Sequence, residues 1–269
     1  MAALPISLRT HLIVYGAACT IRRHNGFWSV VTPGNPTFFW GNFLHFEAAP
    51  GPEDAERWPS LFESHVRTSQ LSRHTAFSWE GYERGASDSF VRRGYHFLES
   101  VIMEAHQLTP AGAVAIEVDM RRIDGDIDWE KLVEFHMHTR DPIHSEADHQ
   151  LYMRRKAAQW RKSAETGLSL IVGAFVGNEL AAALGLYAES KPGPDGRRCA
   201  RYQDVVTDPR WRQRGLCSAL LVYAANELAA HAIDKHFIIA DENDTARNIY
   251  EARGFVAVDR LRGLEFVEA

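Results

Sequence analysis

The sequence predicts a mixed α/β (α+β) fold, in which helices flank a central twisted sheet and a partial repeat precedes it. Short β-branched runs alternate with segments of helical apolar spacing from Val114 onward. Turns that contain glycine or asparagine separate these segments. Several short segments of the N-terminal part also match later ones in a single register. We therefore expect two domains, residues 1–113 and 114–269.

The first elements of the second domain are predicted from apolar periodicity. One strand, two helices and a strand pair are expected in this order: Val114–Val118, Asp128–Thr139, Ala147–Thr166, Leu168–Phe175 and Leu180–Tyr187. The strand pair forms a hairpin, in which Gly177 and Asn178 supply the residues with positive φ. Residues 191–198 are rich in glycine, proline and charge and predict a loop.

Residues 136–149, between the two helices, hold four histidines and three carboxylates. This composition suggests a metal site. No histidine pair has the His-Glu-x-x-His order and no cysteine lies among them, so a polar interhelical loop explains the composition equally well. We expect no metal.

The most informative segment follows the apolar run Tyr202–Val206, which predicts a strand. Residues 208–217 turn through arginine and glycine into a helix expected over Ser218–Ala230. The first amides of a helix have no intrahelical acceptor, and the helix dipole adds positive charge there. Such a turn favours an anion, with phosphate or pyrophosphate as the natural occupant.

Three residues of this turn support the anion site. Gly215 lets the backbone approach an oxygen without a Cβ in the way, and Arg212 and Arg214 add charged donors. A solvated basic turn is the first alternative. A nucleic-acid patch is the second, and the formal net charge of -5 without an extended basic face argues against it.

A second motif begins about thirty residues later. Phe237–Ala240 predicts a short strand, and the acidic residues 241–244 are expected to cap the next helix. That helix carries Ala246, Ile249 and Tyr250 and ends near Gly254.

Together the two motifs resemble those of the GNAT acetyltransferases. The first matches that family's Arg-x-x-Gly-x-Gly/Ala signature at Arg212, Gly215 and Cys217. The second matches its Asn-x-x-Ala-x-x-x-Tyr helix at Asn243, Ala246 and Tyr250, before a Gly-Phe pair. The resemblance extends from Val114 to residue 269 and departs from the family at Cys217, which stands where a small Gly or Ala is usual. The loop could therefore be slightly more open.

This resemblance implies an acetyl-CoA site. The loop with Arg212 would bind the pyrophosphate through the amides of Gln213, Arg214, Gly215, Leu216, Cys217 and Ser218. The preceding strand would pair with the pantetheine arm through Asp204, Val205, Val206 and Thr207. Asn243 and Ala246 belong to the same cofactor site, and Tyr250 would protonate the departing thiolate.

The reaction needs few groups. A primary amine attacks a thioester only when neutral, so a base or a water path must remove a proton, and direct transfer needs no enzyme nucleophile. Asp204 is our candidate base, with Glu189 and Asp241 as alternatives that are also explained as solvated or capping carboxylates. In related enzymes the helices after residue 128 line the acceptor side, and the acidic, histidine-bearing segment there would suit a cationic amine.

The N-terminal domain is predicted to be a degenerate GNAT-like repeat. A shift of 160 positions (250 minus 90) aligns Phe90–Tyr95 with Tyr250–Phe255 and Phe43–Phe46 with Gln203–Val206. The register of the phosphate loop is occupied by residues 48–56, whose prolines lack amide donors and whose acids would repel phosphate. Phe90 replaces the tyrosine hydroxyl, so we expect this half to be non-catalytic, with chance similarity in a separate β-rich domain as the alternative.

Composition limits the remaining possibilities. No apolar run reaches the ~18 residues of a membrane span, and residues 1–9 lack the pattern of a secretion signal. The three cysteines have no metal spacing and are expected to be free thiols in a cytoplasmic protein. We expect an acetyl-CoA-dependent N-acetyltransferase for a small amine, without nucleic-acid or membrane partners and compatible with a homodimer. Protein acetylation and non-catalytic acyl-CoA binding or sensing are the alternatives.

Overall fold

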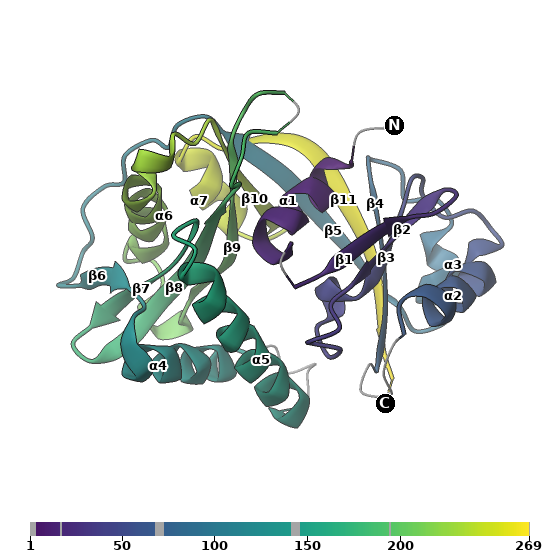
Figure 1. Ribbon diagram of the computed structural model, residues 1–269, viewed down its shortest axis with the longest axis horizontal. Helices are drawn as coiled ribbons and strands as arrows, with labels where there is room; N and C mark the ends of the chain where they lie inside the picture. Colours follow the sequence, from purple (N-terminus) through teal and green to yellow (C-terminus); the bar gives the residue numbers. More distant parts are fainter. Residues whose placement is uncertain (1–3, 17, 68–72, 141–145, 194, 269) are drawn as a thin grey trace. The chain divides into compact units, whose positions relative to one another are not determined.

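The computed structural model describes residues 4–16, 18–67, 73–140, 146–193 and 195–268 (Figure 1). The chain forms two compact units. Unit 1 comprises Met1–Ile102, Ala240–Asp244 and Ala257–Ala269, and unit 2 comprises Met103–Ile239 and Thr245–Val256. No single position in the sequence separates the units, because two short C-terminal segments belong to unit 1.

Unit 2 contains the helices and strands that surround the predicted site. Its helices are α4 (Gly125–His138), α5 (Glu146–Ala164), α6 (Leu216–Glu227) and α7 (Ala246–Ala252), with 3-10 turns η2 (Pro209–Trp211) and η3 (Ala229–His231). Its strands are β6 (Asp119–Arg122), β7 (Ser169–Val176), β8 (Glu179–Ala188), β9 (Cys199–Thr207) and most of β10 (Lys235–Asp241). The end of β5 (His96–Ala105) also belongs to it, and Glu104 there pairs with Lys235 of β10 at 3.0 Å.

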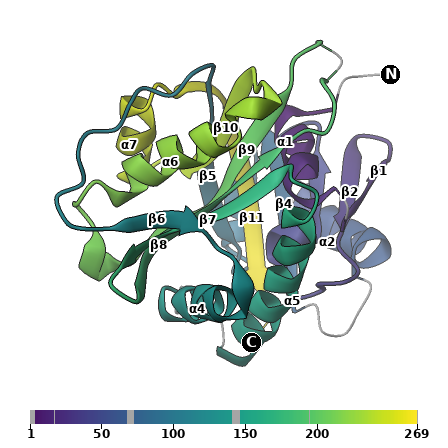
Figure 2. The same cartoon turned by 60° about the vertical axis from the view of Figure 1, so that its left-hand side comes forward.

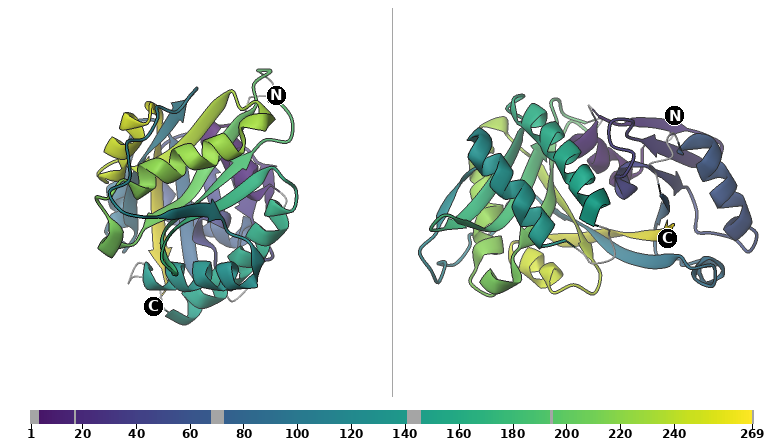
Figure 3. Two further views of the ribbon diagram at one scale, coloured as in Figure 1. Left: turned by 90° about the vertical axis from the view of Figure 1, so that its left-hand side faces the viewer. Right: turned by 90° about the horizontal axis from the view of Figure 1, so that it is seen from below.

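The sheet of unit 2 has the order β6-β7-β8-β9-β10. Neighbouring strands are antiparallel except β9 and β10, which are parallel. Helices α4 and α5 lie side by side and pack against β7 and β8, as two views show (Figures 2 and 3). Strands β7 and β8 are buried along almost their whole length, which explains their nearly continuous apolar sequences.

Most predicted elements of unit 2 are confirmed within a few residues, and three local predictions are wrong. Residues 114–118 form no strand, and the edge strand β6 begins at Asp119 instead. The helix after the glycine loop begins at Leu216 and ends at Glu227, earlier than predicted at both ends. The β7–β8 hairpin has positive φ at Gly177 but not at Asn178, as in a type II′ turn.

Unit 1 has a smaller set of elements. Its helices are α1 (Ile6–Tyr15), α2 (Asp54–His65) and α3 (Ser87–Val91), with a 3-10 turn η1 (Phe39–Gly41). Its strands are β1 (Thr20–Arg23), β2 (Phe27–Val31), β3 (Phe43–Phe46), β4 (His74–Glu80), most of β5 and most of β11 (Val256–Val267). The order β1-β2-β3-β4-β11 is antiparallel except between β3 and β4, which are parallel.

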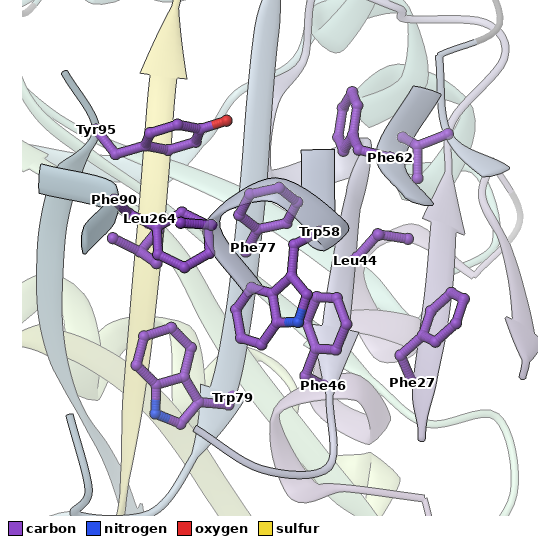
Figure 4. Close-up of a cluster of buried hydrophobic side chains, with 12 residues drawn as sticks. Phe27, Leu44, Phe46, Trp58, Phe62, Phe77, Trp79, Phe90, Tyr95 and Leu264 are labelled. Atoms are coloured by element: carbon purple, nitrogen blue, oxygen red, sulfur yellow. The ribbon is translucent and has the colours of Figure 1, made fainter. Parts of the chain in front are cut away.

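Aromatic side chains fill the core of unit 1 (Figure 4). Trp58 of α2 stacks on Phe46 of β3, with ring centroids 3.6 Å apart and an interplanar angle of 5°. Phe77 and Phe90 contact the same tryptophan edge-on or tilted. Phe90, which takes the register of Tyr250 in the repeat, is therefore a fully buried core residue.

The same order of elements recurs in the two halves of the chain. Adding 160 to the bounds of β4 gives 234–240, against Lys235–Asp241 for β10. The same addition to α2 gives 214–225, against Leu216–Glu227 for α6, and to α3 gives 247–251, against Ala246–Ala252 for α7. In both halves the first of these helices connects two parallel strands: α2 lies between β3 and β4 in the sequence, and α6 lies between β9 and β10.

Candidate functional site

Strands β9 and β10 pair over a short distance and then part. Among the described residues they are paired at three positions, Cys199–Arg201 with Lys235–Phe237. Strand β9 continues to Thr207, so the edge of residues 202–207 that would face β10 has no ladder partner there in the described part of the chain. An unpaired strand edge offers backbone donors and acceptors to an extended ligand. Val205, Val206 and Thr207, predicted to face the pantetheine arm, lie on this stretch and are partly exposed.

Strand β9 contains a bulge at Asp204. The register with β8 passes from Gln203 opposite Gly185 to Val206 opposite Ala183, so two residues of β9 face one residue of β8. Asp204 has a φ of 53°, an angle that few residues other than glycine adopt, although aspartate tolerates it better than most. The bulge breaks the alternation of side chains and directs the Asp204 carboxylate toward helix α5, as its ion pair with Lys156 shows.

The glycine loop leads from β9 into helix α6. Gly215 is the N-cap residue with a φ of 84°, and Gln213 also has a positive φ of 61°. The first intrahelical bond runs from the Ala219 amide to the Gly215 carbonyl at 3.0 Å, so the amides before Ala219 have no acceptor within the helix. A glycine N-cap with free amides after it is the geometry on which the predicted anion site depends.

The arginines of the loop have different surroundings. Arg210 pairs with Asp208 and Glu179, and the hydrogen bond from Arg210 holds the pKa of the Asp208 carboxyl below its ordinary value. Arg212 donates from Nε to the Thr207 carbonyl, and the guanidinium of Arg214 lies over the Trp211 ring at 5.0 Å. Among the described residues, neither Arg212 nor Arg214 forms an ion pair. Both therefore keep their charge available for an anion.

Cys217 occupies the second position of helix α6. The residues with positive φ in this loop are Gln213 and Gly215, and Cys217 is not among them. A side chain at position 217 is therefore compatible with the helical backbone, and the motif requires a glycine only at position 215. Cys217 is partly buried and does not form a disulfide.

Helix α7 holds Tyr250. Its side chain is buried and contacts Phe255, whose ring in turn contacts Tyr202 of β9. Ala246 begins this helix. Thr245 is the N-cap residue, one position after the acidic segment 241–244, and the Asp241 carboxylate accepts from the Asn243 amide at 2.8 Å. Asn243 itself belongs to unit 1.

A buried ion pair joins α5 to the bulge. Lys156 Nζ lies 2.5 Å from Asp204 Oδ1, with side chains only 5% and 17% exposed. The same ammonium donates to the Tyr152 hydroxyl at 2.6 Å and lies 5.0 Å from the ring centroids of Tyr152 and Trp160. Tyr152, Lys156 and Trp160 are four residues apart, so one face of α5 presents all three.

Two further buried groups share the electrostatics of this pair. Burial raises the pKa of the Tyr187 hydroxyl well above its ordinary value, and the Asp204 charge adds to this shift. Burial also lowers the pKa of His136 to about 4, although Asp204 favours the protonated ring. The site around Asp204 thus contains one buried cation, one carboxylate and a histidine that is neutral at pH 7. Glu189, the alternative base, instead accepts from the Cys199 amide at the start of β9.

Acid is expected to destabilise the protein partly through His136. Because its pKa of about 4 lies below the ordinary 6.5, the unfolded state binds the proton more tightly. Stability from this group is present above pH 6.5 and is lost toward pH 4, by about 3 kcal/mol in total. Urea unfolding at several pH values should therefore show a shallower acid slope for His136→Gln than for His138→Gln, an exposed residue of the same helix. Equal slopes would contradict this expectation.

Lys156, Tyr152 and Tyr187 were not identified from the sequence, and His136 was noted only as part of the histidine-rich segment 136–149. The available signal was the spacing Tyr152, Lys156, Trp160, which places an aromatic residue four positions on each side of a lysine in an otherwise very polar helix. Such a row indicates a lysine held between two rings. It does not reveal the carboxylate partner, which comes from another element.

The histidine-rich segment 136–149 is described only in part. Residues 141–145, with His144, lie outside the described residues, and among those described no group of three His, Cys, Asp or Glu side chains is arranged to hold a metal. Of the histidines predicted in that segment, His149 lies with Nε2 3.3 Å from the His136 carbonyl, and His138 lies 3.6 Å from Asp208. None of the described helices combines the length and apolar character needed to span a membrane.

Comparisons with solved structures show the same fold across most of the chain. A functionally unknown conserved protein from Staphylococcus epidermidis is 12% identical with a TM-score of 0.67, covering 92% of this chain and 93% of its own. A GCN5-related N-acetyltransferase from Kribbella flavida is 10% identical with a TM-score of 0.62, covering 98% and 96%. A tandem GNAT protein from the clavulanic acid biosynthesis pathway is 13% identical with a TM-score of 0.54, covering 93% and 83%.

Sequence comparison gives a consistent result. No curated protein matches the chain. The model of the acetyltransferase (GNAT) family matches residues 129–255, a range that includes the parted strand β9, the glycine loop and helix α7. Residues 129–255, just under half of the chain, are therefore similar to the GNAT acetyltransferase domain, and the solved structures show the same kind of fold.

Proposed function

We propose that this protein is an acetyl-CoA-dependent N-acetyltransferase that transfers the acetyl group directly to an amine. The observation that carries the proposal is the course of β9. It parts from β10, bulges at Asp204 and ends in a glycine loop whose helix presents unsatisfied amides. An extended thiol arm with a pyrophosphate at one end requires these two features in this order.

The site residues have distinct proposed roles. The amides of Gln213–Ser218, with Arg212 and Arg214, bind the pyrophosphate, and the free edge of Asp204–Thr207 pairs with the pantetheine arm. Asn243 and Ala246 complete the cofactor site. Tyr250 donates a proton to the departing thiolate. Asp204 accepts a proton from the attacking amine, which requires no covalent enzyme intermediate.

Unit 1 is proposed to be the non-catalytic half of a tandem protein. At the start of α2, the Asp54 carboxylate accepts from the Gly51 amide at 2.7 Å, so the protein's own acid takes the position of an anion. Pro50 and Pro52 provide no amide donors there. The position that corresponds to Tyr250 is the buried Phe90. These features support a structural role for this half.

The proposal is tested by binding and by turnover. Acetyl-CoA at one hundred times its Kd should stabilise the native state by about 2.7 kcal/mol, and a thiol reagent should detect free CoA when amines are added. Failure of acetyl-CoA to bind would exclude the proposal. Binding without turnover over a broad amine panel would favour an acyl-CoA sensor, and labelled acetyl transferred to peptides but not metabolites would identify protein acetylation.

Tyr250→Phe is expected to lower kcat by about a hundredfold, the lower range for loss of a general acid. The affinity for acetyl-CoA should change little, because the ring remains buried against Phe255. Steady-state kinetics with any accepted amine would measure the effect. Tyr223→Phe on helix α6, a partly buried tyrosine of the same unit, is the matched control. Equal kcat values for the two variants would remove Tyr250 from the mechanism.

A further inference from the structure

We propose that the acceptor nitrogen binds between Asp204 Oδ2 and the Tyr187 hydroxyl, and that Lys156 sets the charge of this site so that it selects uncharged, weakly basic amines. This inference rests on the acetyltransferase function proposed above. It assigns two residues, Lys156 and Tyr187, that the reaction scheme so far does not use. It also replaces the cationic acceptor that the acidic segment 136–149 suggested.

Two buried polar atoms near the bulge lack a hydrogen-bond partner among the described residues. Among the described residues, neither Asp204 Oδ2 nor the Tyr187 hydroxyl has a hydrogen-bond partner, although both atoms are buried. Tyr187 as a whole is 1% exposed. Leaving such an atom unsatisfied is unfavourable, and most buried polar groups in proteins are hydrogen-bonded. A ligand that offers N–H donors would satisfy both.

The two atoms lie on adjacent parts of one strand pair. The Tyr187 ring folds back over Gly185, where a Cβ would come within 2.7 Å of Tyr187 Cε2 and 3.0 Å of its hydroxyl. Gly185 pairs with Gln203, the residue before Asp204. The absence of a side chain at Gly185 thus leaves room for the tyrosine ring at the strand position that precedes the bulge. The Asp204 charge also acts on the Tyr187 hydroxyl.

Lys156 decides the charge of this site. Its ammonium neutralises Asp204 through Oδ1 and leaves Oδ2 as the acceptor. Tyr152 and Trp160 hold the lysine in place, and the buried His136 adds no charge at pH 7. A protonated amine in this site would lie beside a second buried cation, which is unfavourable at low dielectric. A neutral amine can instead donate its N–H groups to Asp204 and Tyr187.

The acetyl transfer at this site proceeds in one step. The nitrogen lone pair attacks the thioester carbon, the C–N bond forms and the C–S bond breaks. The nitrogen proton passes to Asp204 Oδ2, and Tyr250 protonates the thiolate. Exchange with solvent restores both groups. Lys156 touches none of the reacting atoms and acts as a positioning residue for Asp204.

The test compares amines of equal size and different basicity. Aniline with cyclohexylamine, and phenylhydrazine with benzylamine, form two such pairs. For each pair the ratio of kcat/KM, weakly basic over strongly basic, is measured at pH 7 by release of free CoA. The wild type is compared with Lys156→Gln, which removes the charge, and with Lys156→Arg, which keeps it. Lys162→Gln, an exposed lysine of the same helix, is the matched control.

The ratio should fall by about tenfold or more in Lys156→Gln, since one buried charge contributes at least that selectivity. It should be retained in Lys156→Arg and in Lys162→Gln. Comparing variants cancels the difference in solution basicity, because every enzyme receives the same amines. Tyr187→Phe should raise KM for aniline more than it lowers kcat, since Tyr187 binds the nitrogen without exchanging a proton.

A second measurement does not depend on turnover. With CoA bound, which has no acetyl group to transfer, aniline should raise the Tm of the wild type and of Lys156→Arg, but not that of Tyr187→Phe. An unchanged ratio in Lys156→Gln overturns the inference and leaves the acetyltransferase function intact. The absence of both turnover and a Tm shift with every amine, while acetyl-CoA still binds, also overturns it. If acetyl-CoA itself does not bind, the proposed function fails instead.

Discussion

Replacing Gly215 with glutamate is expected to raise the Kd for acetyl-CoA by about a hundredfold or more. Gly215 has a φ of 84° at the N-cap of α6, where an L-residue costs roughly 1–2 kcal/mol. The loop would relax and turn its amides away from the pyrophosphate. The added carboxylate would also repel the anion that the loop binds. Isothermal titration of acetyl-CoA measures the change.

Two variants separate strain from charge in this prediction. Gly215→Ala adds only a Cβ, whose nearest atom would be the Ala113 carbonyl at 3.7 Å, so its effect comes from the backbone and should be about tenfold. Gly177→Glu is the matched control, because Gly177 has a φ of 59° in the β7–β8 hairpin and open space around it. Equal affinities for Gly215→Glu and Gly177→Glu would show that the loop does not bind the cofactor.

Lys156→Met is expected to lower the free energy of unfolding by about 3 kcal/mol, the cost of leaving a buried charge without its partner. The Asp204 side chain is 17% exposed, and among the described residues Lys156, at 2.5 Å, is the only cation paired with it. The double variant Lys156→Met/Asp204→Asn carries no buried charge and should recover most of the loss. Asparagine tolerates the positive φ of this position as well as aspartate does.

Urea unfolding at pH 7 measures both variants. Arg122→Met provides the contrast, because its ion pair with Glu227 also joins two elements of unit 2 but is 56% and 33% exposed. Exposed pairs contribute about 0–1 kcal/mol. The single variant Asp204→Asn completes the comparison. If the double variant lost as much free energy of unfolding as Lys156→Met and Asp204→Asn together, Lys156 and Asp204 would not be coupled, and the charge argument for the acceptor site would fail with it.

Features that depend on near neighbours in the chain were predictable. The anion loop needs Gly215 and the arginines within a few residues, and the hairpin at Gly177 needs only its turn and two apolar strands. The 160-residue register also follows from local similarity and agrees with the bounds of α2, β4 and α3. The strand over 114–118 failed because its apolar alternation is too short to distinguish a strand from an extended connection.

The sequence by itself determined the resemblance to the GNAT acetyltransferases, the order of most elements and the glycine loop, because each rests on short-range spacing. Tertiary structure alone decided that Lys156 neutralises Asp204 across 48 positions of chain, and that β11 completes the sheet of unit 1. Ion pairs and strand pairing between distant segments depend on how the whole chain packs, and a residue's own neighbours do not specify them. The charge that an acceptor meets at Asp204 is therefore a property of the fold.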